Sequence, residues 1–299
     1  MRCAGIVTFN PQIKRLRDNI DAVVLQVDVV FVFDNGSANV DEIEMLVDTY
    51  DGVVHLQKAG ENLGIAAGLN AVLHWAADHC CTAVLLLDQD SVSTPGMVDS
   101  LVRLLTDGVG LVCPFILDRN RLNEETYLKQ KAKPVEQLTS AASHGAITSG
   151  SLVDVNAALA IGGFDEALFI DYVDFDFNER LLLNGYAIVK DNRVYLIHEK
   201  GKSEKTFIKV PRRNVNGAIM WQPLYKLGYG PVRCYYQTRN RIIFWKKYHR
   251  WTKFEGLTEI PLLMALSLLF ENNRCAKLRA YARGIKAGVT MKVKEYRQP

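Results

Sequence analysis

The sequence of 299 residues lacks long hydrophobic runs. No apolar stretch reaches the roughly 20 residues that a helix needs to span a bilayer. The N-terminus leads directly into a strand-like segment at residues 3–9, without the separate apolar region and cleavage site of a signal peptide. We therefore expect a chain with neither a secretory leader nor a membrane-spanning helix.

Several short motifs are absent as well. The six cysteines include no Cys-x-x-Cys pair, and several lie in apolar segments, which favours buried thiols in a reducing compartment over disulfides. No Gly-x-Gly-x-x-Gly sequence occurs, so a dinucleotide-binding domain is poorly supported. No internal repeat or low-complexity tract is present. Hydrophobic and charged contents of 48% and 23% are those of an ordinary globular protein.

Positive charge is scarce in the first 200 residues and concentrated after them. Residues 201–299 contain 21 Lys and Arg residues and 5 acidic residues, a net charge of +16. Residues 1–200 contain 15 Lys and Arg residues and 28 acidic residues, a net charge of −13. This asymmetry indicates either a polyanionic partner for the C-terminal third or packing of that third on the acidic body. The candidate partners are anionic lipid, a lipid pyrophosphate and nucleic acid.

Apolar runs and helical patterns alternate through residues 1–117. We predict strands at 3–9, 28–33, 53–57, 83–87 and 110–117, with helices at about 13–25, 39–49, 65–79 and 95–106 between them. Such alternation is typical of βαβ units in a mainly parallel sheet, whose right-handed crossovers place the strand-to-helix turns at one edge. Four polar turns should therefore converge on one cleft, at 8–11, 34–37, 61–64 and 88–91.

The predicted strand at 83–87 ends in Asp88-Gln89-Asp90. The carboxyl end of a buried parallel strand is where open α/β sheets bind ligands. Two neighbouring carboxylates repel each other, and Mg²⁺ or Mn²⁺, which prefers carboxylate and phosphate oxygens, removes that cost. We interpret Asp88 and Asp90 as candidates for a metal–nucleotide site, and an ordinary acidic loop is the alternative.

Two other turns also fit a nucleotide. Asp34 ends a strand and can accept hydrogen bonds from a base or ribose, although it can equally cap the turn made by Asn35-Gly36. Gly64 permits close approach of a phosphate or ribose to the start of a helix, where an anion is favoured. For Gly68, tight helix packing is the alternative reading.

The combination of these three turns resembles the family 2 inverting glycosyltransferases of the GT-A fold, and most of all their bacterial rhamnosyltransferase branch. The resemblance covers about residues 1–200 and rests on Phe33-Asp34-Asn35-Gly36-Ser37, Asn62-Leu63-Gly64-Ile65-Ala66 and Leu87-Asp88-Gln89-Asp90-Ser91. It implies an α/β fold, Rossmann-like, with a mainly parallel central sheet and flanking helices, here followed by a helical, basic C-terminal extension. It also implies a nucleoside-diphosphate-sugar donor, with nucleotide-binding residues Thr8, Asn10, Asp34, Asn35, Asn62, Gly64, Asp88 and Gln89.

The resemblance also assigns roles after residue 118. The segment 168–180 is similar to the family's acidic helix start, which places the general base at Asp174, with Asp171 as a possible partner. Many relatives have Glu-Asp where this chain has Val173-Asp174. Helix capping and surface charge are the alternative for Asp171 and Asp176. The family has a His-x-x-Gly sequence at this place, in which the histidine approaches the metal or diphosphate. The resemblance therefore implies Asp88, Asp90 and His198 as metal ligands, and a structural role is the alternative for His198.

Three further segments supply candidates for binding the diphosphate or the acceptor. They are the turn before a strand at 148–153, a basic loop, and a Tyr-Tyr-x-x-Arg-Asn motif that resembles one in the rhamnosyltransferases. A tight turn, surface solvation and core packing, respectively, are the alternatives. The candidate residues are Ser149, Gly150, Ser151, Arg212, Arg213, Arg239 and Asn240.

We expect three parts in the chain. A GT-A catalytic domain at 1–201 comprises a nucleotide-binding half at 1–117 and an acceptor-side half at 118–201, the latter with an irregular crossing at 118–145 and a strand hairpin at 186–197 that turns at Asp191-Asn192. A basic loop or lid follows at 202–231, and a helical region at 232–299. Aromatic and basic residues mix at 241–254, which is typical of a membrane interface, although core or dimer packing fits too.

The resulting hypothesis is a metal-dependent inverting transferase that moves L-rhamnose from dTDP-β-L-rhamnose to a hydroxyl of a lipid-linked cell-surface polysaccharide precursor. We expect a cytoplasmic enzyme on the inner face of the plasma membrane, with an anionic membrane surface and a possible homodimer as partners and no nucleic acid. A UDP-sugar donor, galactofuranose or another hexose, is the alternative. A nucleotidyltransferase would need a basic triphosphate loop that residues 8–11 lack, and a non-catalytic binder of membranes or anionic polymers would leave the four converging turns unexplained.

Overall fold

The computed structural model describes residues 1–119, 127, 133–139, 146–199, 204–213, 219–226, 228–254 and 256–296, without the side chains of 212 and 213. The chain divides into two compact units. Among the described residues, the first unit contains 1–127, 133–169 and 173–199. The second contains the tripeptide 170–172 and the residues from 204 onward.

Strands and helices alternate through the first 120 residues, as the sequence predicts. The strands are β1 (Arg2–Thr8), β2 (Val29–Asp34), β3 (Val54–Lys58), β4 (Ala83–Asp88), β5 (Val92–Ser93) and β6 (Val109–Asp118). The helices are α1 (Ile13–Val24), α2 (Val40–Val47), α3 (Ile65–Asp78) and α4 (Met97–Leu104), with a short 3₁₀ turn, η1 (Asp48–Tyr50). Strands β1, β2, β4 and β6 are rich in apolar residues because they are buried on both faces of the sheet, whereas the edge strand β3 is largely exposed.

The remaining elements of the first unit complete the sheet. They are β7 (Val135–Leu138), β8 (Leu152–Asp154), α6 (Val155–Ala160), η2 (Glu166–Leu168), α7 (Val173–Leu183) and β9 (Ala187–His198). The strand order is β3-β2-β1-β4-β8-β6-β9-β5, and β7 pairs with β9. The pairs among β1 to β4 and the pair β6–β9 are parallel, whereas β8, β5 and β7 pair antiparallel. The predicted α/β fold with a mainly parallel central sheet is confirmed.

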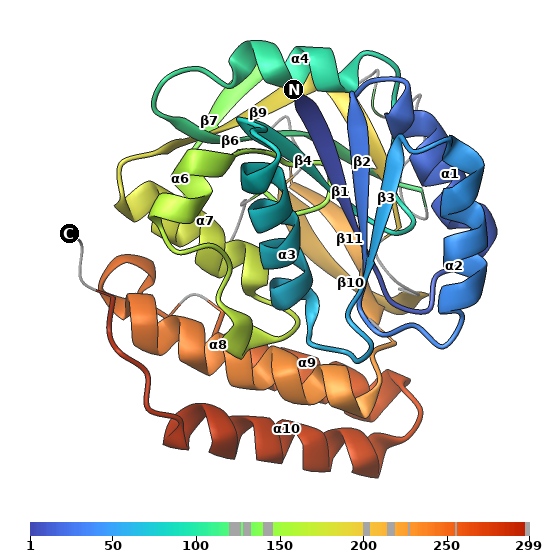
Figure 1. Cartoon of the computed structure of the whole chain (residues 1–299). Helices are drawn as coiled ribbons and strands as arrows, with labels where there is room; N and C mark the ends of the chain where they lie inside the picture. The colour runs from blue at the N-terminus through green and yellow to red at the C-terminus, as the bar shows by residue number, and fades with distance from the viewer. Residues whose placement is uncertain are drawn as a thin grey trace. The chain divides into compact units, whose positions relative to one another are not determined.

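Helices cover both faces of this sheet (Figure 1). The apolar faces of α1, α2 and α4 join one core cluster with alternate residues of β1, β2 and β4. On the other face, α3 packs so closely that a Cβ atom at Gly68 would lie 2.6 Å from a methyl group of Val7. This contact supports the packing explanation for Gly68. The two layers hold the carboxyl ends of the parallel strands at one edge.

One predicted hairpin is wrong. Residues 187–198 form a single strand, β9, and do not turn back at Asp191-Asn192. The register against β6 shifts there, since Pro114 faces Asp191 but Phe115 faces Tyr195. A bulge of this kind accommodates the polar residues without ending the strand. As a result β9 carries its last residue, His198, to the edge where β4 ends.

The second unit contains a hairpin and three helices. Strands β10 (Glu204–Arg213) and β11 (Ile219–Lys226) pair antiparallel, so the prediction of a loop through this region is wrong for these residues. The helices are α8 (Pro231–Thr252), α9 (Glu259–Phe270) and α10 (Arg274–Thr290), which confirms the predicted helical C-terminal region. Among the described residues, no helix combines the length and the apolarity needed to cross a bilayer.

Helices α8 and α10 pack against each other through small residues (Figure 1). A Cβ atom at Gly284 would lie 2.6 Å from the carbonyl oxygen of Tyr235, and one at Gly288 would lie 2.8 Å from Ile242. On α8 itself, Ile243, Phe244 and Tyr248 are fully buried. The segment at 241–254 is therefore largely core in its first half, in agreement with the packing alternative.

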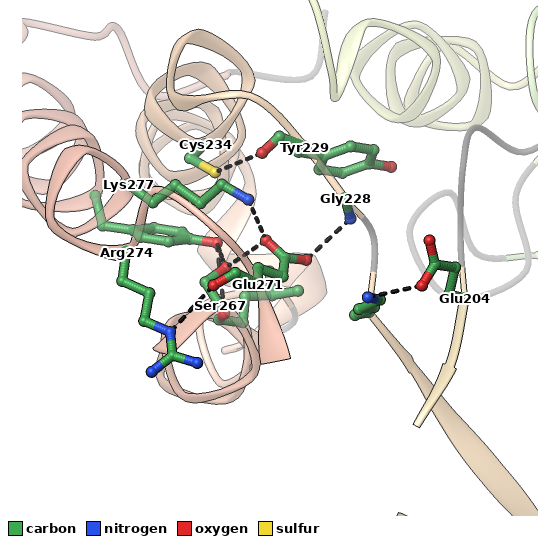
Figure 2. Close-up of polar contacts among 11 residues, drawn as sticks. Glu204, Gly228, Tyr229, Cys234, Ser267, Glu271, Arg274 and Lys277 are labelled. Atoms are coloured by element: carbon green, nitrogen blue, oxygen red, sulfur yellow. Dashed lines mark hydrogen bonds and ion pairs between the residues drawn. The ribbon is translucent and has the colours of Figure 1, made fainter. Parts of the chain in front are cut away.

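A buried ion pair fastens the start of α10 within this unit. Figure 2 shows Lys277 and Glu271 side by side, with their nitrogen and oxygen atoms 2.5 Å apart. The Glu271 carboxylate also accepts hydrogen bonds from the Gly228 amide and the Ser267 hydroxyl. Burial by itself raises the pKa of Glu271, but the hydrogen bonds from Lys277 and Gly228 outweigh burial and lower it.

Candidate active site

The four polar turns meet at one edge of the sheet, linked by hydrogen bonds. The Phe9 amide donates to Gln89 Oε1 at 2.7 Å, which joins the turns after β1 and β4. The Asn10 amide donates to Ser37 Oγ at 2.8 Å, which joins the turns after β1 and β2. Asn35 Nδ2 donates to Asn62 Oδ1 at 3.2 Å, which joins the turns after β2 and β3. The parallel topology brings the predicted turns together, since each follows a strand of the same parallel set.

Asp34 is almost completely buried in this assembly. One carboxylate oxygen accepts the Thr8 hydroxyl hydrogen at 3.0 Å, and the other accepts the amides of Gly36 and Ser37. The side chain thus performs the turn-capping role that the sequence left open. A nucleoside that reached Asp34 would have to share oxygens that the protein already uses.

Gly64 precedes α3 at a position where the backbone conformation and a close contact favour glycine. Gly64 adopts a φ of +91°, and a Cβ atom there would lie 2.8 Å from the Phe169 carbonyl oxygen. That same oxygen accepts the Ile65 amide, one of the unpaired donors at the helix N-terminus. Asn62 and Asn35 accept the neighbouring amides of Gly64 and Leu63. These contacts shape the turn, and the predicted nucleotide contacts of Asn35, Asn62 and Gly64 stay a prediction.

The Asp-x-Asp turn follows β4 as predicted. The backbone of Asp88 is held at both polar groups, because its amide donates to Ser149 Oγ at 3.0 Å and its carbonyl accepts Asn19 Nδ2 at 2.7 Å. The side chain of Asp88 is 39% exposed. Asp90 lies two residues on in the same turn, and its carbonyl oxygen accepts Arg119 Nη2 at 3.4 Å. Both acids therefore lie in the turn at this edge, and the Asp88 side chain is partly accessible there.

His198 lies beside Asp88 at the end of β9. Its Nδ1 is 4.0 Å from Asp88 Oδ2 and 3.0 Å from Ser91 Oγ. Ser91 Oγ in turn lies 2.8 Å from Ser149 Oγ. Ser149 and Ser151 are both buried, so these two acceptor candidates serve the turn beneath Asp88, with the Ser151 hydroxyl donating to the Ile147 carbonyl.

The donor atoms at this edge suit a hard divalent cation. Carboxylates of Asp88 and Asp90 are the oxygen ligands that Mg²⁺ and Mn²⁺ prefer, and Asp88 is accessible. Among the residues that the structure describes, however, no three His, Cys, Asp or Glu side chains gather as a ready-made metal site. The predicted set of Asp88, Asp90 and His198 is therefore not preassembled, and phosphate oxygens of a ligand would have to complete the coordination.

The predicted base lies in the first turn of α7. Asp174 is partly buried, and its Oδ1 accepts the amide of Phe175. Asp176 is completely buried and pairs with Arg180 at 2.8 Å, so the alternative of a surface charge is wrong for this residue. Of the two acids in the helix start, Asp174 is the more accessible to a ligand.

Asp171 belongs to the second unit, where α8 holds it. Arg233 pairs with both carboxylate oxygens at 2.9–3.2 Å, and Asn240 Nδ2 donates to the carbonyls of Ile170 and Asp171 at 2.8 Å. Arg241 donates to the Tyr172 hydroxyl. Asp171 and Tyr172 both have positive φ, a strained backbone that these contacts maintain.

The same contacts account for part of the Tyr-Tyr-x-x-Arg-Asn motif. Asn240 is fully buried, and its Oδ1 accepts Arg239 Nε at 2.8 Å. The Arg239 guanidinium lies over the ring of Tyr236, 4.7 Å from its centre. Asn240 thus organises the chain within the unit, and any ligand contact of Arg239 stays a prediction. The side chains of Arg212 and Arg213 lie outside the described part of the chain.

Two residues in this region were missed by sequence reasoning. Asn19 lies on the buried face of α1 with Leu16, Ile20 and Val23, and it supports the Asp88 carbonyl. A polar residue on an apolar helix face was the available signal. Ser91 had none, because a single serine after Asp-x-Asp carries no pattern of its own.

The fold just described is that of a GT-A glycosyltransferase, and the solved structures with similar folds agree. A mannosyltransferase from Pyrobaculum calidifontis in complex with GDP-Man and Mn²⁺ has a TM-score of 0.56 and 17% identity, covering 98% of this chain and 76% of its own. GalNAc-T7 with UDP, GalNAc and Mn²⁺ has a TM-score of 0.60 and 13% identity, covering 97% and 56%. S. aureus TarS 1–349 with UDP-GlcNAc has a TM-score of 0.58 and 12% identity, covering 96% and 80%.

The chain belongs to glycosyl transferase family 2, whose sequence pattern matches residues 3–156. A curated relative, the dTDP-rhamnosyl transferase RfbF of Shigella flexneri, is 27% identical over 271 residues, which cover 88% of this chain and 82% of the relative. The predicted family and the class of enzyme are confirmed.

Proposed function

We propose that this chain transfers L-rhamnose from dTDP-β-L-rhamnose, with inversion, to a hydroxyl of a cell-surface polysaccharide precursor. Membership of the family supports sugar transfer, and the relative named as a dTDP-rhamnosyl transferase supports the donor. The observation that carries the proposal is the edge at the end of β4. There Asp88 and Asp90 follow a buried parallel strand beside the turns after β1, β2 and β3.

Asp88 and Asp90 would hold Mg²⁺ or Mn²⁺ together with phosphate oxygens of the donor. Two glycosyltransferases of similar fold are complexes with Mn²⁺. Ser149 and Asn19 fix the backbone of Asp88, so the carboxylate starts from a defined position. A bound ion would supply Lewis-acid stabilisation of the departing diphosphate.

Asp174 is the proposed general base. Its carboxylate takes the proton of the acceptor hydroxyl while that oxygen forms a bond to the anomeric carbon and the bond from this carbon to the diphosphate oxygen breaks. Attack on the face opposite the diphosphate inverts the anomeric centre, so a β-L donor gives an α-L linkage. Asp174 suits this role better than Asp176, which is buried against Arg180.

We also propose that the acceptor is carried on a lipid pyrophosphate and that the second unit docks on the anionic inner face of the membrane. On α9, Pro261, Leu262, Ala265, Leu268 and Leu269 are exposed and spaced three and four apart on one helix face. The helix also exposes the acid Glu259, which pairs with Arg241. On β10 and β11, Phe207 and Trp221 are exposed, and the Phe207 ring contacts Phe270 at the end of α9. Exposed apolar faces of this kind mark interaction sites.

Charge favours a bilayer as the occupant of this face. Lys205 and Lys209 are exposed on β10, two residues before and two residues after the exposed Phe207. The chain from residue 201 onward carries a net charge of +16. Aromatic rings flanked by lysines suit the headgroup region of an anionic bilayer.

The function is tested by turnover of dTDP-β-L-rhamnose with a lipid-linked oligosaccharide extract as acceptor. We expect metal-dependent release of dTDP and an α-L-rhamnosyl product, identified by its anomeric NMR signals. Turnover of a UDP-hexose and not of dTDP-β-L-rhamnose would contradict the proposed donor but not the proposed mechanism. Release of pyrophosphate from a nucleoside triphosphate would contradict sugar transfer and favour a nucleotidyltransferase.

A further inference from the structure

We propose that His198 is a hydrogen-bond donor to the diphosphate of the donor nucleotide and not a ligand of the metal ion, and that Ser91 and Ser149 set this role as positioning residues. The inference rests on the proposed function for the identity of the ligand. Its structural basis is a chain of four polar groups within the first unit, the Asp88 amide, Ser149 Oγ, Ser91 Oγ and His198 Nδ1, with successive distances of 3.0, 2.8 and 3.0 Å.

The direction of the hydrogen bonds in this series of four groups follows from the Asp88 amide at one end. The Asp88 backbone N–H can only donate, so Ser149 Oγ accepts from it. Ser149 and Ser91 are 1% and 0% exposed, and among the described residues their hydroxyl groups contact only the other members of this series of four groups. Buried hydroxyl hydrogens need an acceptor, so each serine must pass its hydrogen to a neighbour in the chain.

Only one arrangement provides an acceptor for both hydroxyl hydrogens. Ser149 donates to Ser91, and Ser91 donates to His198 Nδ1. If Nδ1 carried the hydrogen and donated to Ser91, one of the two serine hydrogens would have no acceptor. The network therefore selects the imidazole form in which Nδ1 is an acceptor and Nε2 carries the hydrogen.

The second ring nitrogen is open to a ligand. Within the described part of the chain, His198 Nε2 has no recorded partner, and it is not among the solvent-inaccessible polar atoms that lack one. A metal ion needs a nitrogen lone pair, which Nε2–H does not offer and which Nδ1 directs at Ser91. The His198 ring lies beside Asp88, with its Nδ1 atom 4.0 Å from Asp88 Oδ2. The Nε2–H group is suited to an anionic oxygen, and a diphosphate held by a cation at Asp88 and Asp90 supplies one.

The form of the imidazole can be measured in the protein without any ligand. Long-range ¹H–¹⁵N spectra of ¹⁵N-histidine-labelled protein distinguish the protonated from the unprotonated ring nitrogen, and His198→Gln identifies the signal among the six histidines. We expect Nε2–H in the wild type and a loss of this preference in Ser91→Ala. The matched control is Ser93→Ala, another buried serine that lies outside the chain of groups. A proton on Nδ1 in the wild type overturns the proposal.

The ligand contact is measured by the affinities for dTDP and for inorganic pyrophosphate, each with Mn²⁺. His198→Ala should weaken both by about 10- to 100-fold, the effect of one hydrogen bond to a charged group. His198→Gln, which can place an amide N–H near the position of Nε2, should recover most of the loss. In electron spin-echo spectra of the Mn²⁺–dTDP complex, we expect no signal of a directly bound histidine nitrogen.

The remaining outcomes contradict the role of His198, the proposed function, or both. A directly bound nitrogen, or affinities within twofold of the wild type in His198→Ala, overturns the proposal. Binding of pyrophosphate without binding of any nucleoside diphosphate rejects the proposed function and leaves the role of His198 standing. Failure of the wild type to bind either ligand rejects both.

Discussion

At the scale of single residues, Asp174 carries the most specific chemical claim. Its replacement by Asn keeps the size and the amide contact with Phe175 but removes the proton acceptor. We expect Asp174→Asn to lower kcat by about 10²- to 10⁴-fold, the range of general-base catalysis, with the Kd for dTDP unchanged. Steady-state turnover and calorimetry measure the two effects. Retention of most activity in this variant would remove Asp174 from the mechanism.

The buried acid Glu271 makes stability depend on pH. Its pKa is lowered from the ordinary value of 4.5 because the hydrogen bonds from Lys277 and Gly228 outweigh burial. A lowered folded-state pKa means that the stabilisation is complete above about pH 4.5 and is lost as the pH falls through the folded value. In urea unfolding, we expect the free energy of unfolding to fall below that pH and Glu271→Gln to reduce the pH dependence.

The same variant tests the ion pair itself. At pH 7, Glu271→Gln leaves the Lys277 ammonium buried without its counter-charge and should cost about 3–5 kcal/mol. The double variant Glu271→Leu, Lys277→Met removes both charges and should recover most of this loss. If the single and double variants lose equal stability, packing and not charge pairing accounts for the site.

At this scale the sequence indicated which residues lie at the edge of the sheet more reliably than it indicated their hydrogen-bond and ion-pair partners. Asp88, Asp90 and His198 do lie at one edge. The capping of Asp34 by the Gly36 and Ser37 amides, and the burial of Asp176 against Arg180, depend on turn geometry and on neighbours that the pattern does not specify. A strand-end acid looks the same in sequence whether its oxygens face a ligand or its own turn.

At the scale of elements, Asn240 of α8 holds the backbone of residues 170 and 171. Replacement of Asn240 by Ala leaves the carbonyls of Ile170 and Asp171 without their donor. We expect a loss of about 1–3 kcal/mol in the free energy of unfolding, because two partly buried acceptors lose their donor. The control on the same helix is Val232→Ala, at an exposed position, with a change within about 0.5 kcal/mol. Equal effects of the two variants would contradict the assigned role.

The elements themselves were predicted most accurately where periodicity is strongest. The strands and helices predicted up to residue 118 lie within two residues of their predicted ends, whereas the short strand β5 was not predicted. The hairpin β10–β11 was missed because its lysines, arginines and prolines obscure the alternation of a strand. The bulge in β9 was read as a turn because Asp191-Asn192 is a turn-like pair and pairing with β6 is not visible in sequence.

At the scale of the whole molecule, the exposed face of α9 and the β10–β11 hairpin predicts binding to anionic membranes. The variant Phe207→Ser, Leu269→Ser should lose about tenfold in cosedimentation with phosphatidylglycerol-containing vesicles, and binding to phosphatidylcholine vesicles should be weak throughout. The control is Leu25→Ser, an equally exposed leucine at the end of α1. If vesicle binding is unchanged and the variant instead dissociates a dimer in sedimentation experiments, the face is an interface between copies.

The measurement that tests the central claim most directly is a thermal-shift panel of dTDP, UDP, GDP and CDP, each with and without Mn²⁺. A ligand at about 100 times its Kd adds roughly 2.7 kcal/mol to the stability of the folded state, a readily detected shift. We expect stabilisation by dTDP that depends on Mn²⁺ and is lost in Asp90→Ala. A preference for UDP would replace the donor and keep the fold and metal site, whereas no response to any nucleotide would contradict a nucleotide-sugar transferase.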